Sequence, residues 1–254
     1  MQDTENSNGA ESASFGFREV PENEKAGLVR GVFDSVSGRY DIMNDLMSGG
    51  AHRLWKDSFV ARVAPRDGER IVDVAGGTGD IAFRMAAAAP GARIDVCDIN
   101  ESMIRTGRNR AFDRGIVSGL DWSVGDAEHL PFPDRTFDAY TIAFGLRNVT
   151  RPLQALKDAY RILKPGGRYY CLEFSQVQAP AMAAIYDLYS FNLLPKIGRY
   201  VARDEESYRY LAESIRMFPN QERLKDLMRE AGFARVSHRN MFGGIVAVHC
   251  GWRI

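Results

Sequence analysis

The stretch IVDVAGGTGDIAF, residues 71–83, decides the fold. It begins with the short apolar run 71–75, passes through a glycine-rich loop, and continues into an alanine-rich segment that favours a helix until Pro90. Glycines in such a turn let the backbone approach a ligand closely, and amides at a helix start offer donors to polar groups. The stretch therefore predicts a strand, a ligand-binding turn and a helix.

Similar units follow along the chain. Further strands are expected at 93–98, 120–126, 137–145 and 168–174. Asn100 is suited to cap a helix that ends near Gly115, and Pro152 is suited to open a helix that stops at Lys164-Pro165-Gly166-Gly167. Five alternations of strand and helix predict an α/β fold with an open, parallel, doubly wound sheet.

The end of the chain has a different pattern. A helix is expected at 221–231, followed by strands at 234–241 and 244–252. Only Phe242-Gly243-Gly244 separates these strands, which is too short for a parallel crossover and suits a hairpin. We therefore expect a mostly parallel, seven-stranded sheet with a C-terminal antiparallel hairpin.

The remaining segments predict one elaborated domain. Residues 1–25 hold six acidic and two basic residues, and we interpret 1–20 as a disordered acidic tail. Residues 21–254 are expected to form a single domain with N-terminal helices at 27–63, interrupted at 48–50, where Ser-Gly-Gly predicts a helix stop. The insertion 176–217, rich in Tyr and Phe, is expected to be a helical cap or lid over the substrate.

Composition excludes several classes of protein. The 33 basic and 33 acidic residues give no net charge, which argues against a nucleic-acid partner. The three cysteines include no C-x-x-C pair and the four histidines are dispersed, so we expect no metal site and a cytoplasmic location. No run approaches the 18 or so apolar residues that a transmembrane helix needs, so an integral membrane protein is not expected.

Two cofactor classes compete for the glycine loop. Gly77 to Ala82 satisfies the G-x-G-x-x-G/A fingerprint of dinucleotide binding, and Asp98, 19 residues after Gly79, is suited to accept ribose hydroxyls in either class. Gly125-Asp126-Ala127 places an acid after the third strand, where a buried adenine amino group would need an acceptor. Together with the C-terminal hairpin, this pattern favours S-adenosylmethionine over a nicotinamide dinucleotide.

The sequence resembles the class I methyltransferases, and more narrowly the ubiquinone/menaquinone biosynthesis C-methyltransferase family. The resemblance runs from about residue 25 to the end and is carried by GRYDIMNDLMS (38–48), DVAGGTGDIA (73–82), DINESM (98–103), GDAEHLPFPDRTFD (125–138), FGLRNV (144–149), SYRYLAESI (207–215), FPNQERLKDLMREAGF (218–233) and GIVAVHCG (244–251). The family fold agrees with the expected α/β sheet. The resemblance implies methyl transfer from S-adenosylmethionine to a ring carbon of a polyprenyl quinol.

The resemblance also implies the site residues. The cofactor contacts that it implies, with the glycine loop, are Tyr40, Gly76, Thr78, Gly79, Asp98, Met103, Asp126 and Ala127. One departure is Ala143, where many members have Ser, so a hydroxyl contact from that position is absent here.

Arg147 and Asn148 are the predicted catalytic residues, because they follow the fourth strand at the carboxyl edge of the sheet. The family resemblance points to Arg147 as catalytic, and a guanidinium stays protonated in ordinary sites. Our hypothesis is that Arg147 lowers the pKa of the substrate phenol by its charge, while Asn148 orients a hydroxyl or a water. The alternative is that Arg147 forms a salt bridge that holds the loop.

The implied substrate predicts a further partner, the membrane. A polyprenyl tail lies in the bilayer, so transient peripheral contact is expected through 181–203, which holds apolar aromatics and the basic residues Lys196, Arg199 and Arg203. In the alternative, the same aromatics pack the lid. A homodimer or a quinone-biosynthesis complex is also compatible with the resemblance. Other functions that stay open are O- or N-methylation, nicotinamide-dependent oxidoreduction, and a non-catalytic cofactor-binding subunit of a quinone-synthesis assembly.

Overall fold

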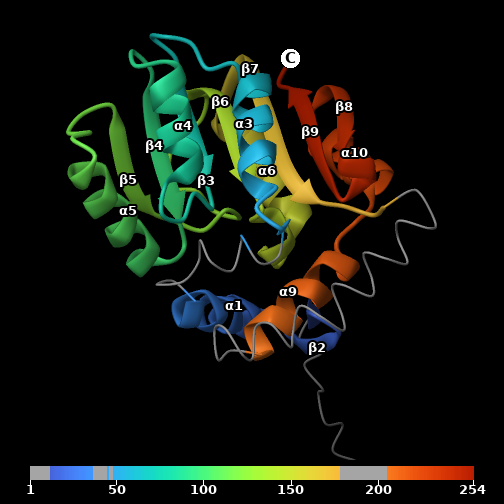
Figure 1. The fold of residues 1–254 in the computed structure, drawn as a ribbon. Helices are drawn as coiled ribbons and strands as arrows, with labels where there is room; N and C mark the ends of the chain where they lie inside the picture. Colours follow the sequence, from blue (N-terminus) through green and yellow to red (C-terminus); the bar gives the residue numbers. More distant parts are fainter. Residues whose placement is uncertain (1–11, 37–44, 46–47, 178–204) are drawn as a thin grey trace, which may run out of the picture.

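The computed structural model describes residues 12–36, 45, 48–177 and 205–254. Its centre is a seven-stranded sheet in the order β5-β4-β3-β6-β7-β9-β8 (Figure 1). The strands are β3 (Arg70–Val74), β4 (Arg93–Asp98), β5 (Leu120–Val124), β6 (Phe137–Ala143), β7 (Leu163–Phe174), β8 (Ala234–Met241) and β9 (Val246–Trp252). Strands β3 to β7 pair in parallel, whereas β9 is antiparallel to both β7 and β8. The expected fold class is confirmed.

Helices cover both faces of the sheet, because each strand directs alternate apolar side chains to opposite sides. One core cluster joins the sheet to α3 (His52–Val63), α4 (Asp80–Ala88) and α5 (Glu101–Asp113). The other joins it to α6 (Pro152–Ile162) and α10 (Gln221–Glu230). In β3, Ile71 belongs to the first cluster and Val72 to the second. The sheet and the helices on its two faces therefore form a three-layered α/β domain.

Local signals in the sequence explain the helix starts. The side chain of Asn100 accepts hydrogen bonds from the amides of Ser102 and Met103, so the predicted cap of α5 is confirmed. Pro152 is the first residue of α6, as expected. The short helix η5 (Phe242–Gly244) connects β8 to β9, which confirms the hairpin.

Strand β7 begins earlier than the sequence indicated. It starts at Leu163 and includes the Lys-Pro-Gly-Gly segment that was expected to be only a helix stop. The backbone after β9 explains the difference, since Gly166 N donates to the carbonyl of Arg253 and Arg253 N donates to the carbonyl of Gly167. A partner 86 or more residues away thus extends the strand, and local sequence carries no signal for it.

The expectation of a disordered tail up to residue 20 is wrong from Ser12 onward. Residues Ser12–Phe15 (β1) and Arg18–Pro21 (β2) form an antiparallel hairpin that leads into α1 (Glu22–Val36). The reason is tertiary packing, since the buried ring of Phe15 stacks on Tyr210 of α9 (Glu205–Met217). The acidic composition of residues 1–25 as a whole could not reveal that contact. The tail residues 1–11 lie outside the described part of the chain.

A small layer, which we call the cap, covers one end of the sheet. It consists of β1, β2, α1 and α9, and Figure 1 shows α1 and α9 side by side below the sheet. The helical prediction for 176–217 is confirmed for α9, and residues 178–204 lie outside the described part. The predicted helices at 27–63 are present as α1 and α3, with α1 starting at Glu22. Within the described residues, no helix has the length and apolar character to cross a bilayer.

Candidate active site

A cavity of about 850 Å³ lies where the carboxyl ends of the parallel strands meet the cap. Its position is the one where ligands bind in open α/β sheets. The sheet side of its wall contains Val74, Ala75, Gly77, Asp98, Asn100, Met103, Asp126, Ala127, Ala143, Gly145 and Asn148. The cap side contains Ala26, Val29, Arg30 and Phe33 of α1. Five predicted cofactor or catalytic residues therefore face one cavity.

The glycine loop brings its backbone to the cavity wall. Gly77 has a φ of +56°, and a Cβ atom there would lie 3.2 Å from Cε of Met103. Gly76 and Gly79 are not part of the wall and serve packing instead. A Cβ atom at Gly76 would lie 2.6 Å from Cγ1 of Val96, and a Cβ atom at Gly79 would lie 2.6 Å from the Trp122 ring. The three glycines thus have separate roles, and only Gly77 is placed for ligand contact.

Asp98 is fixed at the end of β4 by two backbone amides. Its Oδ2 accepts from Gly77 N at 2.9 Å, and its Oδ1 accepts from Asn100 N at 2.8 Å. Burial raises the pKa of the Asp98 carboxyl, and the two amides oppose that shift. A carboxylate oxygen can accept more than one hydrogen bond, so both oxygens keep capacity for ligand hydroxyls. This geometry suits the predicted role toward ribose.

Asp126 and Ala127 enter the wall after β5. Asp126 accepts the amide of Glu128 through Oδ1 at 2.9 Å and forms an isolated bridge with His129. This turn positions the acid at the cavity, as the sequence predicted.

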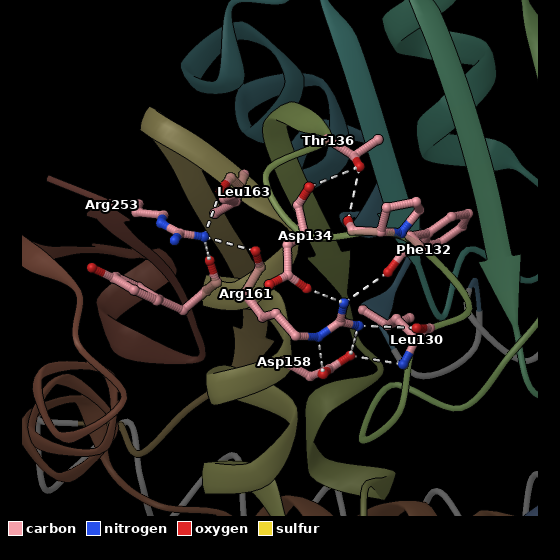
Figure 2. A network of polar contacts seen from close by, with 10 residues as sticks. Leu130, Phe132, Asp134, Thr136, Asp158, Arg161, Leu163 and Arg253 are labelled. Atoms are coloured by element: carbon pink, nitrogen blue, oxygen red, sulfur yellow. Dashed lines mark hydrogen bonds and ion pairs between the residues drawn. The ribbon is translucent and has the colours of Figure 1, made fainter.

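The segment that follows is held by Arg161 of α6 (Figure 2). The guanidinium donates to the carbonyls of Leu130 and Phe132 at 3.0 and 2.8 Å and pairs with Asp134 and Asp158. Asp158 in turn accepts the amide of Leu130 at 2.7 Å. A partly exposed arginine–carboxylate network therefore anchors the loop that carries Asp126 to the neighbouring helix.

Besides Gly76 and Gly79, two more predicted cofactor residues are not placed in this cavity, Thr78 and Tyr40. The side chain of Thr78 is buried and accepts from Arg110 Nη1 at 3.0 Å. It lines a second, strongly basic cavity of about 570 Å³ with His52, Arg53, Asp80, Phe83, Arg84, Arg110 and Arg114. Tyr40 lies outside the described residues. The predicted cofactor contacts of Thr78 and Tyr40 stay predictions.

The two predicted catalytic residues lie in the turn after β6, but their side chains have different surroundings. Arg147, in the short helix η2 (Leu146–Asn148), donates through Nη1 to Glu173 Oε1 at 2.7 Å and to the carbonyl of Phe144 at 2.5 Å. Its guanidinium lies over the Phe174 ring, and the side chains of Arg147 and Glu173 are 4% and 1% exposed. Arg147 is absent from the cavity wall, whereas Asn148 is part of it. The geometry favours the loop-holding alternative for Arg147.

Glu173 is the site residue that sequence reasoning missed. Its carboxylate also accepts the amides of Arg147 and Phe174. Burial raises the pKa of Glu173 above its ordinary value, and the Arg147 guanidinium opposes that shift. The available signal in the sequence was the single acidic residue of the otherwise mostly apolar strand RYYCLEF. A buried charge requires a partner, so this residue indicated a buried ion pair.

Comparisons with known proteins agree with this geometry. Residues 18–253 match the model of the ubiE/COQ5 methyltransferase family. The ubiquinone/menaquinone biosynthesis C-methyltransferase UbiE of Cereibacter sphaeroides is 59% identical over 240 residues, which cover 94% of this chain and 96% of that protein. The protein of the same name from Paracoccus denitrificans is 57% identical over the same shares of the two chains.

Solved structures give the same fold at low sequence identity. A possible histamine N-methyltransferase of Thermotoga maritima aligns with a TM-score of 0.63 and 23% identity, over 89% of this chain and all of that one. A putative methyltransferase in complex with the Trm112 activator of Haloferax volcanii aligns with a TM-score of 0.63 and 17% identity, over 87% and 97% of the two chains. These two likenesses concern the fold alone. By its family match and its 59% identical relative, the chain belongs to the ubiE/COQ5 methyltransferase family.

Proposed function

We propose that this chain methylates a ring carbon of a polyprenyl benzoquinol or naphthoquinol in ubiquinone or menaquinone biosynthesis, with S-adenosylmethionine as the methyl donor. The observation that carries the proposal is the 59% identity, over 94% of the chain, to a protein named for that activity. The cavity at the carboxyl edge of the sheet supports it.

The cavity wall fits S-adenosylmethionine. Asp98 presents a carboxylate for the ribose hydroxyls, and Asp126 presents an acceptor for the adenine amino group. Val74, Met103 and Ala127 provide apolar surface for the adenine ring. The backbone at Gly77 comes close without a side chain, which leaves room for the rest of the ligand. These groups suit a single nucleoside, as in S-adenosylmethionine, better than a dinucleotide.

When it is bound, S-adenosylmethionine supplies a methyl group on a cationic sulfur; its transfer leaves the thioether, forms a carbon–carbon bond and releases the ring hydrogen as a proton. The protein has to align the two reactants and stabilise phenolate character on the ring. Asn148 is a side chain of the described wall that is suited to donate to a phenolate oxygen. The apolar side chains of Val29 and Phe33 in α1 keep water from the reacting atoms.

We assign Arg147 a positioning role in this reaction. Glu173, 2.7 Å away, offsets the charge that would otherwise lower the pKa of the substrate phenol. The pair holds the turn that carries Asn148, because Arg147 also donates to the carbonyl of Phe144 at the start of that turn. The catalytic contact to substrate is therefore assigned to Asn148 and the support to Arg147.

The activity is tested with purified protein, methyl-labelled S-adenosylmethionine, and chemically reduced demethyl quinols with short prenyl tails. We expect label on a ring carbon of the product and no transfer to the oxidised quinones. Label on a ring oxygen would favour the O-methyltransferase alternative. Tight binding of the cofactor with no transfer to either quinol class would favour the non-catalytic subunit.

We further propose peripheral membrane contact from the cytoplasmic side, since the tail of the substrate lies in the bilayer. Residues 181–203 supply the apolar aromatics and basic side chains that such contact needs, and they lie outside the described residues. The test is sedimentation with anionic liposomes after substitution of Lys196, Arg199 and Arg203 by Gln. Unchanged binding would contradict the assignment to this segment.

A further inference from the structure

The segment SYRYLAESI, residues 207–215, belongs to α9 and contacts the active-site turn. The hydroxyl of Tyr210 donates to Asn148 Oδ1 at 3.0 Å. The same tyrosine is 4% exposed, and its ring stacks on Phe15 of β1 with 4.3 Å between the ring centroids and 19° between the planes. Tyr210 therefore joins the cap to a residue of the cavity wall.

The direction of this hydrogen bond follows from its neighbours. The other end of the Asn148 amide, Nδ2, lies 3.5 Å from the carbonyl oxygen of Phe144. A carbonyl oxygen only accepts, so the amide nitrogen has to face Phe144 and the amide oxygen has to face Tyr210. The tyrosine is then the donor. Burial raises the pKa of Tyr210 to about 12, so its hydroxyl keeps the proton that it donates.

A second contact fixes the same helix to the N-terminal hairpin. Glu213 accepts the amide of Phe17 at 3.1 Å, across 196 residues of sequence. Gly16 has a φ of +60°, and a Cβ atom there would lie 2.2 Å from Glu213 Oε2, so the turn packs directly against the carboxylate. Tyr210 and Glu213 thus hold α9 and the hairpin together while Tyr210 reaches Asn148.

We propose that Tyr210 is a positioning residue for methyl transfer: it holds the Asn148 amide so that Nδ2 remains the donor toward the ring oxygen of the substrate. This inference rests on the proposed function. Without the hydroxyl, only the long 3.5 Å contact of Nδ2 with the Phe144 carbonyl opposes a 180° rotation of the amide, which would present the amide oxygen to a phenolate and be repulsive. A donated hydrogen bond to Oδ1 also polarises the amide and strengthens the donor at Nδ2.

The test is the variant Tyr210→Phe, which keeps the ring that stacks on Phe15 and removes only the hydroxyl. We expect kcat for methyl transfer to fall about tenfold, since one hydrogen bond is lost, while KM for S-adenosylmethionine changes less than about twofold. The matched control is Tyr169→Phe, because Tyr169 is equally buried, lies in β7 and is absent from the cavity wall. We expect its kcat to equal that of the wild type.

A double-mutant cycle separates positioning from general stability. In the Asn148→Ala background the hydroxyl has no amide to hold, so we expect Tyr210→Phe to cause no further loss of kcat. An equal tenfold loss in both backgrounds, or an unchanged kcat in Tyr210→Phe, would overturn the inference and leave the proposed function intact. If the wild type transfers no methyl group to any quinol, the proposed function and this inference both fall.

Discussion

Replacement of Glu173 by Gln tests whether the buried ion pair holds the active-site turn. The substitution keeps the volume of the side chain and removes its charge. Arg147 and Glu173 have side chains 4% and 1% exposed and approach to 2.7 Å, so the guanidinium would be left in the core without a counter-charge. Loss of one partner of such a pair costs about 3–5 kcal/mol of unfolding free energy. For a chain of 254 residues, this corresponds to a fall in Tm of roughly 6–20 °C.

The assay is urea unfolding followed by far-UV circular dichroism, with two comparison variants. Glu101→Gln removes a pair to Arg105 whose side chains are 72% and 67% exposed, and it should cost less than about 1 kcal/mol. The double variant Arg147→Met with Glu173→Gln removes both charges of this pair and should recover most of the loss. An unfolding free energy for Glu173→Gln within about 1 kcal/mol of the wild type would refute the reasoning. That result would mean that the charge of Glu173 does not contribute to the stability of the folded chain.

Ligand binding and pH supply three further tests. S-adenosylmethionine at about 100 times its Kd should stabilise the fold by about 2.7 kcal/mol, a rise in Tm of roughly 5–11 °C by scanning fluorimetry, whereas NADH should have no effect. Asp98→Asn should weaken S-adenosylmethionine binding about 10- to 100-fold by calorimetry, because charge-assisted bonds to the ribose are lost; an unchanged Kd would remove Asp98 from the site. Burial lowers the pKa of His249 to about 4 from 6.5, so below pH 6.5 the unfolded chain binds a proton that the folded chain binds only near pH 4. The unfolding free energy should therefore fall by up to about 3 kcal/mol as the pH drops from 6.5 to 4, and urea titrations of His249→Gln should lack this part of the slope.

The sheet could be predicted from sequence because its signals are local. The run at 71–75, the cap at Asn100 and the proline at the start of α6 each act within a few residues. The start of β7 and the N-terminal hairpin could not be predicted. Both depend on partners far along the chain, the backbone of Arg253 for β7 and the ring of Tyr210 for β1. The acidic excess of residues 1–25 as a whole made residues 12–20, whose only charged residues are Arg18 and Glu19, look like part of a solvated tail.

The candidate site divides in the same way. Asp98, Asp126 and Asn148 could be predicted because each lies at or after the carboxyl end of a strand, and the carboxyl ends of parallel strands meet at one edge. The role of Arg147 was uncertain in sequence because a cationic side chain after a strand can face the ligand or the core. Glu173 decides between these orientations, and its position opposite Arg147 is a product of the folded sheet. Whether Arg147 also acts on the substrate stays a prediction.

The position of β9 in the sheet has a consequence for the order of assembly during synthesis. β8 is made before β9, yet in the sheet β9 lies between β7 and β8 and pairs with both. The newly made β8 therefore has no strand to join, and the edge of β7 stays open, until β9 has left the ribosome. An unpaired strand edge is a template for contacts with other chains. During synthesis there is thus a stage in which the strands up to β8 have been made and the edge of β7 that pairs with β9 has no partner.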